Sequence, residues 1–446
     1  MFRVNQRARQ TESPQLASEL DKLLAKYQSI ANSDPLQLRS LIPPQELWRL
    51  FVDGVKQHRG WQSFEINEPG YLKALYLAFD KLFEQAVVLS ADLILSMHRH
   101  AMENVRDTNY ERERTRHKDH EANQPGNFRQ AEPVDYSIGG YFFSASNTKA
   151  IGTATCSGIK EYIQKDDKKN SWHAFSLYYR SRHTSTFEDV IISKEFVMKA
   201  RQCRNIRCDE KLIEAMRDFI YFDIYNLLMF VDYKFDDRRM KGLANFIRAV
   251  GRTKDDDGLA KIIHTIACGI EAPFGAYGIL AISAQRINTP EQLYNDVNAL
   301  IATYHSEIIK THTHEGRLRT ITNLVQSLEQ LHPFMDGNCR TFCMLLLNYL
   351  LIHNGFPLVI CEDPNRFDLH SKDELFKEVI QGMKNTFSLI EEKELFNYRT
   401  VVDDGHGDYF LTITATEIMR RRARLNKENE TTKDHTNTQH ANTFRL

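Results

Sequence analysis

The chain has 446 residues, more than one average domain requires, and its 58 Lys and Arg residues are balanced by 59 Asp and Glu residues. This balance argues against nucleic acid as a partner, and no apolar run is long enough to span a membrane. Seven cysteines without regular spacing and a polar start without a secretory signal favour reduced thiols in a cytoplasmic setting.

The first hundred residues predict four helices. The first covers residues 14–31, the second opens at Pro43-Pro44, and the third runs from Tyr71 to Val88. Ser90 is the expected N-cap of the fourth helix. The apolar side of this helix carries Leu93, Ile94, Met97, His98 and Ala101. We expect an N-terminal helical segment over residues 1–65, with the main core beginning at residue 66.

Two stretches in the middle of the chain predict β-hairpins. Residues 138–155 combine glycines with aromatic residues, and residues 274–287 contain the apolar run 279–282. Between them, residues 158–255 are interpreted as an inserted helical unit with an apolar helix from Leu212 to Phe230. This unit either binds a partner or extends the core. The mixed-charge run 111–121 is expected to be a solvated helix end or loop.

Two helices flank a short polar loop at residues 332–340. Apolar residues recur at helical spacing over 318–331, and residues 342–352 are apolar on nearly every side, as in a helix at the centre of a core. This second helix should stop at Asn354-Gly355. Because the loop precedes a helix N-terminus, free backbone N–H groups and the helix dipole favour an anion site there.

The C-terminal part predicts a hairpin followed by a tail. The core should end at residue 395, and the turn sequence 403–407 predicts a hairpin within residues 396–425. Residues 426–446 are almost without apolar residues and are expected to be disordered. Such tails resemble export signals of bacterial effectors, so secretion into a host cell is the alternative localisation.

The loop resembles the motif of the Fic family, H-P-F-x-D-G-N-G-R-x-x-R. Cys339 stands where the family has Gly, and Cys343 stands where it has a second Arg. Residues 89–98 also resemble an early helix of the family. The resemblance implies a mainly α fold: a Fic-type helical bundle with a β-hairpin flap, over residues 66–157 and 256–395, split by the insertion. Either hairpin could be the flap. The matching residues are His332, Pro333, Phe334, Asp336, Gly337, Asn338 and Arg340.

The resemblance also implies an enzyme that transfers AMP from ATP to a Tyr, Thr or Ser hydroxyl of a target protein, such as a small GTPase of a host. His332 would be the base, since neutral imidazole is available near pH 7. Asp336 would hold Mg²⁺. The nucleotide phosphates would be bound by Gly337, Asn338, Cys339 and Arg340.

The two departures from the motif leave other functions open. Without the second Arg, the site should hold a triphosphate less firmly. Phosphocholine, UMP or a phosphoryl group could then be the transferred group. A catalytically degenerate Fic domain that acts as a binding module is a further alternative. On a regular helix starting near Asn338, Cys343 is expected to face the nucleotide.

Overall fold

The computed structural model describes residues 5–30, 42, 44–52, 60–84, 88–103, 105, 125–129, 137–138, 155–165, 174–180, 187–222, 237–268, 277–283, 289–334 and 336–392. The predictions for residues 111–121, 396–425 and 426–446, and for most of the 138–155 hairpin, lie outside these residues. Within them, no helix is long and apolar enough to cross a membrane.

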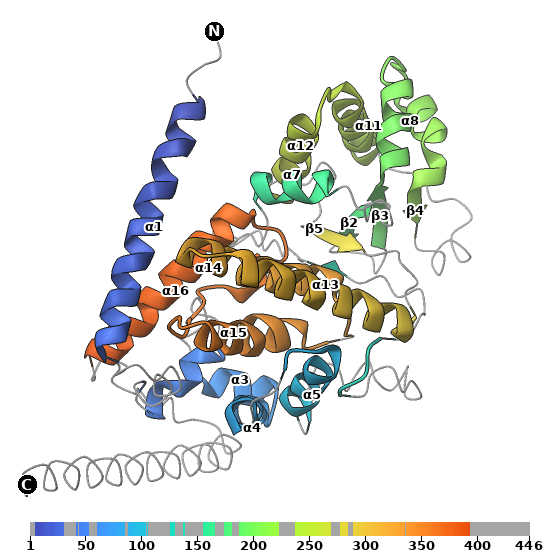
Figure 1. Cartoon of the computed structure of the whole chain (residues 1–446). Coiled ribbons are helices and arrows are strands. Elements are labelled where there is room, and N and C mark those ends of the chain that lie inside the picture. Colours follow the sequence, from blue (N-terminus) through green and yellow to red (C-terminus); the bar gives the residue numbers. More distant parts are fainter. Residues whose placement is uncertain are drawn as a thin grey trace, which may run out of the picture.

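The protein is mainly α-helical, and most of its helices share one large hydrophobic cluster. Helix α1 lies along α14 and α16, and the buried helix α15 lies between them and the pair α4 and α5 (Figure 1). Residues from both ends of the described chain therefore build one core. The elements of this cluster are α1 (Asn5–Ile30), η2 (Pro44–Leu50), α3 (Gln62–Asn67), α4 (Tyr71–Glu84), α5 (Ala91–Met102), α13 (Pro290–Lys310), α14 (His314–Leu331), η6 (Arg340–Leu346), α15 (Leu347–His353), η7 (Pro364–Phe367) and α16 (Lys372–Glu392).

The predicted start of α5 at Ser90 is confirmed, and local capping determines this and two further helix starts. The Ser90 hydroxyl accepts a hydrogen bond from the Leu93 N–H at the start of α5. Thr289 and Gln292 form a capping box at the start of α13. The apolar helix before the loop is α14, which Thr313 caps. Of the third predicted helix, Tyr71–Glu84 is helical as α4 and Val88 is not, whereas residues 85–87 lie outside the described residues.

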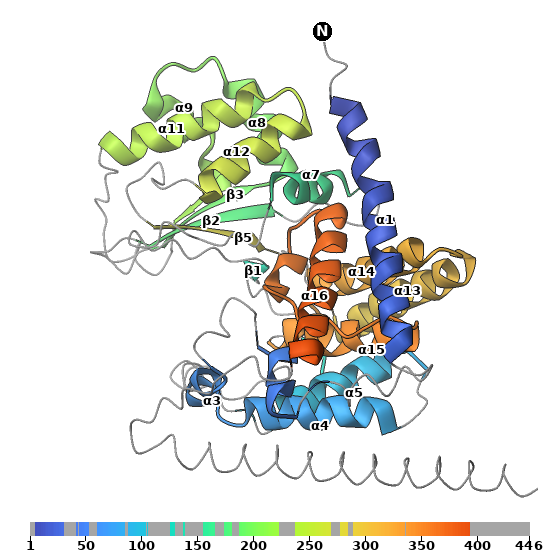
Figure 2. The same ribbon diagram turned by 90° about the vertical axis from the view of Figure 1, so that its left-hand side faces the viewer.

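A second hydrophobic cluster joins helices to a sheet (Figure 2). Its helical elements are α7 (Cys156–Gln164), α8 (Lys194–Cys203), α9 (Asp209–Ala215), η5 (Arg217–Phe219), α11 (Asp237–Arg252) and α12 (Asp256–Cys268). The antiparallel sheet has the order β1-β5-β2-β3-β4. Its strands are β1 (Ser137–Ile138), β2 (Ala174–Arg180), β3 (Phe187–Ile192), β4 (Ile220–Phe222) and β5 (Tyr277–Ser283).

The structure corrects the prediction of a purely helical insertion. Strands β2, β3 and β4 lie within residues 158–255, and the helix expected from Leu212 to Phe230 ends at Ala215. Ile220–Phe222 forms a strand that pairs with β3. A short apolar run rich in aromatic and β-branched residues suits a buried helix and a strand equally, so sequence periodicity could not separate them. The second cluster also includes α7 and α12, and so it extends beyond the predicted limits of 158 and 255.

The structure describes only residues 277–283 of the predicted 274–287 hairpin, and the rest of it lies outside the described residues. Residues 277–283 form the single strand β5, whose partners are β1 and β2. Both partners are more than ninety residues earlier in the chain, so the pairing that completes this strand is not local. The apolar run 279–282 was read correctly as a strand, and tertiary pairing supplies the strands that lie beside it.

The two clusters meet where α7 packs on residues 369–370. The Thr155 N–H donates to the Leu369 carbonyl, and the Leu369 side chain is part of the second cluster. At Gly158 a Cβ atom would lie only 1.8 Å from the Leu369 carbonyl oxygen. Close approach of two backbones at this point therefore requires glycine.

Replacing Gly158 by alanine is expected to lower the free energy of unfolding by about 3 kcal/mol, because the new methyl group pushes α7 away from the carbonyl. Chemical denaturation followed by circular dichroism measures this loss. Gly258→Ala in α12 is the control: its nearest neighbour would be the flexible Asp255 side chain, at 3.3 Å. We expect this control to be neutral or stabilising by up to about 1 kcal/mol. Equal effects of the two substitutions would contradict the close approach at Gly158.

Candidate active site

The polar loop begins where α14 ends, at His332. This residue has a left-handed backbone with φ 47°, and its N–H donates to the carbonyls of Leu328 and Glu329. A non-glycine residue rarely adopts this conformation, so the surroundings must hold it in place. The helix therefore ends at a fixed point, and His332 is the C-cap that follows its last residue, Leu331.

Asn338 closes the loop from its other end. Its side-chain oxygen accepts a hydrogen bond from the Phe334 N–H, and its amide nitrogen donates to the Phe334 carbonyl, both at 3.0 Å. Asn338 and Phe334 are buried. The Asn338 side chain thus fixes the loop, and any contact of this residue with a nucleotide would come from its backbone.

Asp336 and Gly337 form the turn of the loop. The Asp336 carboxylate is about half exposed and accepts a 2.6 Å hydrogen bond from the Gly337 N–H. Gly337 has φ +75°, and a Cβ atom there would lie 2.5 Å from the Met102 sulfur. Glycine is therefore required at this position, both for its backbone and for its contact with α5.

An exposed carboxylate such as Asp336 suits Mg²⁺, which binds proteins through one or two carboxylates and keeps several waters. In the part of the chain that the structure describes, no three His, Cys, Asp or Glu side chains are grouped to hold a metal ion. A Mg²⁺ here would therefore depend on Asp336, water and the phosphates of a donor.

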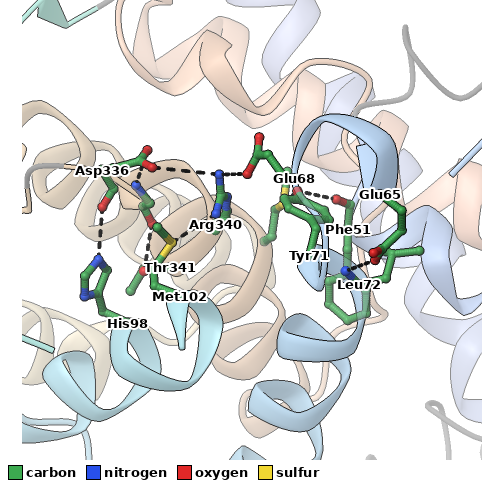
Figure 3. Close-up of polar contacts among 12 residues, drawn as sticks. Phe51, Glu65, Glu68, Tyr71, Leu72, His98, Met102, Asp336, Arg340 and Thr341 are labelled. Carbon is green, nitrogen blue, oxygen red and sulfur yellow. Dashed lines mark hydrogen bonds and ion pairs between the residues drawn. The ribbon is translucent and has the colours of Figure 1, made fainter. Parts of the chain in front are cut away.

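His98, on α5, fixes the backbone of Asp336. The Gly126 N–H donates to His98 Nδ1 at 2.8 Å, so Nε2 carries the proton and donates to the Asp336 carbonyl at 3.0 Å (Figure 3). The ring stacks on Phe334 with centroids 3.8 Å apart. Burial lowers the pKa of His98 to about 4, so the ring is neutral at pH 7. From the sequence, His98 was predicted only to lie on the apolar side of a helix, and its contact with the loop was not predicted.

Arg129 lies against the start of the loop, and its side chain is 1% exposed. Its backbone N–H donates to the Pro333 carbonyl and its Nε donates to the His332 carbonyl, both at 2.9 Å. The guanidinium thus binds the carbonyl of the residue whose backbone is left-handed. Nothing in the sequence around residue 129 singled out this role.

The imidazole of His332 is neutral near pH 7. Burial, followed by the positive charge of Arg129, lowers the pKa of His332 to about 4, although the carboxylate of Asp336 acts in the opposite direction. At pH 7 the imidazole therefore carries no charge and can accept a proton.

Arg340 is held by residues of α4 and α5, of the turn between α3 and α4, and of the loop itself (Figure 3). Its Nη2 forms an ion pair with the Glu68 carboxylate and lies 4.0 Å from Oδ2 of Asp336. Its Nη1 donates to the Met102 sulfur at 3.0 Å, and the guanidinium stands 4.9 Å from the Tyr71 ring centroid. The cation expected to bind phosphates therefore already has a carboxylate partner, which the sequence did not reveal.

Cys343 does not face the loop, contrary to expectation. Its side chain is 1% exposed, and its sulfur lies 3.7 Å from a carboxylate oxygen of the buried Glu329. Burial raises the pKa of both groups, with the nearby Asp368 adding to the effect on Glu329. The expectation assumed α-helical spacing, whereas Arg340–Leu346 is a π-helix with a wider turn. Cys339, one residue before the π-helix, is partly buried against the main cluster.

The loop thus places His332, Asp336, Gly337, Asn338, Cys339 and Arg340 in one short segment, and Cys343 lies in the core. Residues 259–351 match the family model described as Fic/DOC family. This segment, which contains α14, the whole loop, η6 and most of α15, is a Fic/DOC family domain.

The chain is also similar to the phosphocholine transferase AnkX of Legionella pneumophila subsp. pneumophila (strain Philadelphia 1). The two are 25% identical over 379 residues, which cover 81% of this chain and 31% of the relative. The chain thus spans about a third of the length of this relative. The similarity to this relative covers much more of the chain than the family match does. Glu68, His98 and Arg129 all lie before residue 259, where the family match begins.

Proposed function

We propose that this chain is a Fic-type transferase that moves a phosphate-containing group from a nucleotide donor to a hydroxyl side chain of another protein. The observation that supports this most directly is the loop geometry. A neutral imidazole, an exposed carboxylate and a guanidinium lie at His332, Asp336 and Arg340 within nine residues. These are the base, the metal ligand and the phosphate-binding cation that such a transfer needs.

In the proposed reaction, His332 accepts the proton of the Ser, Thr or Tyr hydroxyl. The hydroxyl oxygen then forms a bond to the donor phosphorus, and the bond from phosphorus to the leaving phosphate oxygen breaks. Arg340 and the backbone N–H groups of Asn338 and Cys339, at the helix N-terminus, bind the phosphate oxygens. Mg²⁺ bound by Asp336 would neutralise part of the phosphate charge.

We propose CDP-choline as the donor, so that phosphocholine is transferred and CMP leaves. Three observations support this choice over ATP. Cys343 replaces the second Arg and lies buried against Glu329, Arg340 is already balanced by Glu68, and the relative is named a phosphocholine transferase. Transfer of AMP from ATP is the second candidate, favoured by the motif itself. A small GTPase as target and export into a host cell remain predictions.

Intact-mass measurement tests this proposal. The full chain is incubated with Mg²⁺ and a lysate, or a panel of candidate target proteins, together with CDP-choline, ATP or UTP separately. A phosphocholine-sized increment with CDP-choline, absent for His332→Ala, is the expected result. An AMP-sized increment with ATP alone would overturn the choice of donor. No increment with any donor, and no difference between wild type and His332→Ala, would favour a binding module instead.

A further inference from the structure

Glu68 lies in the turn between α3 and α4, and hydrogen bonds within that turn determine its position (Figure 3). The Glu65 carboxylate accepts from the N–H groups of Gly70 and Leu72, at 2.8 and 2.7 Å. The Tyr71 N–H donates to the Glu68 carbonyl at 3.1 Å. The turn is therefore closed on itself, and the Glu68 carboxylate points towards Arg340.

The Glu68–Arg340 ion pair is largely removed from water. The Arg340 side chain is 11% exposed and that of Glu68 is 24% exposed. The Tyr71 ring covers the face of the guanidinium and stabilises Arg340 in this position by a cation–π contact. In such surroundings the effective dielectric constant is lower than that of water, so the charges of the pair are felt strongly within the loop.

Negative side chains around Arg340 offset its positive charge, whereas a strong anion site has an excess of positive charge. Two carboxylates, Glu68 and Asp336, stand within 4.0 Å of the same guanidinium nitrogen. Mg²⁺ at Asp336 would offset one of them, but the carboxylate of Glu68 would still neutralise Arg340. Because the remaining positive potential is small, each further negative charge on a donor gains little attraction from the loop.

We propose that Glu68 is a specificity-determining residue that limits the positive charge Arg340 presents, and so favours a weakly anionic donor over a triphosphate. A triphosphate places more negative charge at the loop than a diphosphate esterified to a cationic group such as choline. The inference rests on the proposed function for the identity of the preferred donor. It assigns the choice of donor partly to a residue outside the family match.

Glu68→Gln tests the proposal because it removes the charge but keeps an oxygen that can accept from Arg340. Calorimetry without acceptor protein, at fixed Mg²⁺, measures the affinity of the full chain for ATP, ADP and CDP-choline. We expect ATP to bind ~10-fold more tightly, equivalent to about 1.4 kcal/mol, and CDP-choline to gain clearly less. ADP should lie between them. The gain for ATP should shrink as salt is added.

Glu103→Gln is the matched control, since Glu103 is exposed and is the C-cap of α5, directly after Met102. The same loss of charge there should leave all three affinities nearly unchanged. If Glu68→Gln changed ATP and CDP-choline affinity equally, or weakened both, Glu68 would only position Arg340 and the proposal would be overturned. No change would overturn it as well. Since binding is measured without turnover, this result is independent of whether transfer occurs.

Discussion

Replacing His332 by alanine is expected to lower the rate of transfer by ~10²–10⁴-fold, the usual contribution of a general base. The substitution removes the imidazole that accepts the hydroxyl proton and leaves Asp336 and Arg340 in place. Donor affinity should change much less than turnover, because the donor phosphates bind elsewhere in the loop. Initial rates at saturating donor, together with calorimetry, separate the two effects.

His314→Ala is the control for this experiment, since His314 begins the same helix and its side chain is 51% exposed. Its pairing with the exposed Asp21 should contribute little to stability. We expect near wild-type rates for this variant. A His332→Ala enzyme that turned over as fast as His314→Ala would show that another group takes the proton.

Replacing Arg129 by methionine is expected to impair transfer in a pH-dependent way. In the wild type, the rate should be constant above about pH 5 and should fall as the pH drops through about 4, where His332 becomes protonated. Arg129 is one cause of this lowered pKa, so its removal raises the pKa of His332. The acid limb of kcat/KM should therefore move to higher pH, and the variant should lose more activity at pH 5 than at pH 8.

The same substitution also removes the hydrogen bond from Arg129 Nε to the His332 carbonyl. A hydrogen bond from a charged group contributes about 1.5–3 kcal/mol, and a loss of this size is expected in the free energy of unfolding. Arg129→Lys retains the charge, so the acid limb of its kcat/KM profile should lie close to that of the wild type. Its free energy of unfolding should recover less fully. Profiles of kcat/KM against pH and denaturation curves measure the two quantities.

Arg248→Met provides a comparison, because Arg248 also forms an ion pair, with Asp209, and belongs to α11, a helix of the second cluster. It should lower stability without moving the acid limb. If Arg129→Met reduced activity by the same factor at every pH, its effect would be structural only, and its influence on His332 would be refuted.

Local signals in the sequence were sufficient wherever a few neighbouring residues determine the structure. The Ser90 cap, the two helices around the loop and the order of its polar residues all follow from residues that lie within one or two helical turns of each other. The sequence predicted neither the distant pairing of β5 with β2 nor the irregular helix geometry at Arg340–Leu346.

The amino-acid sequence by itself determined which chemical groups the loop contains: a base at His332, a carboxylate at Asp336 and a cation at Arg340, on a turn before a helix. Only the tertiary structure decided the state of those groups. Arg129 contacts His332 from 203 positions away, His98 contacts Asp336 from 238, and Glu68 pairs with Arg340 from 272. The charge and pKa of a side chain depend on its burial and its neighbours in space, and those neighbours are distributed along the whole chain.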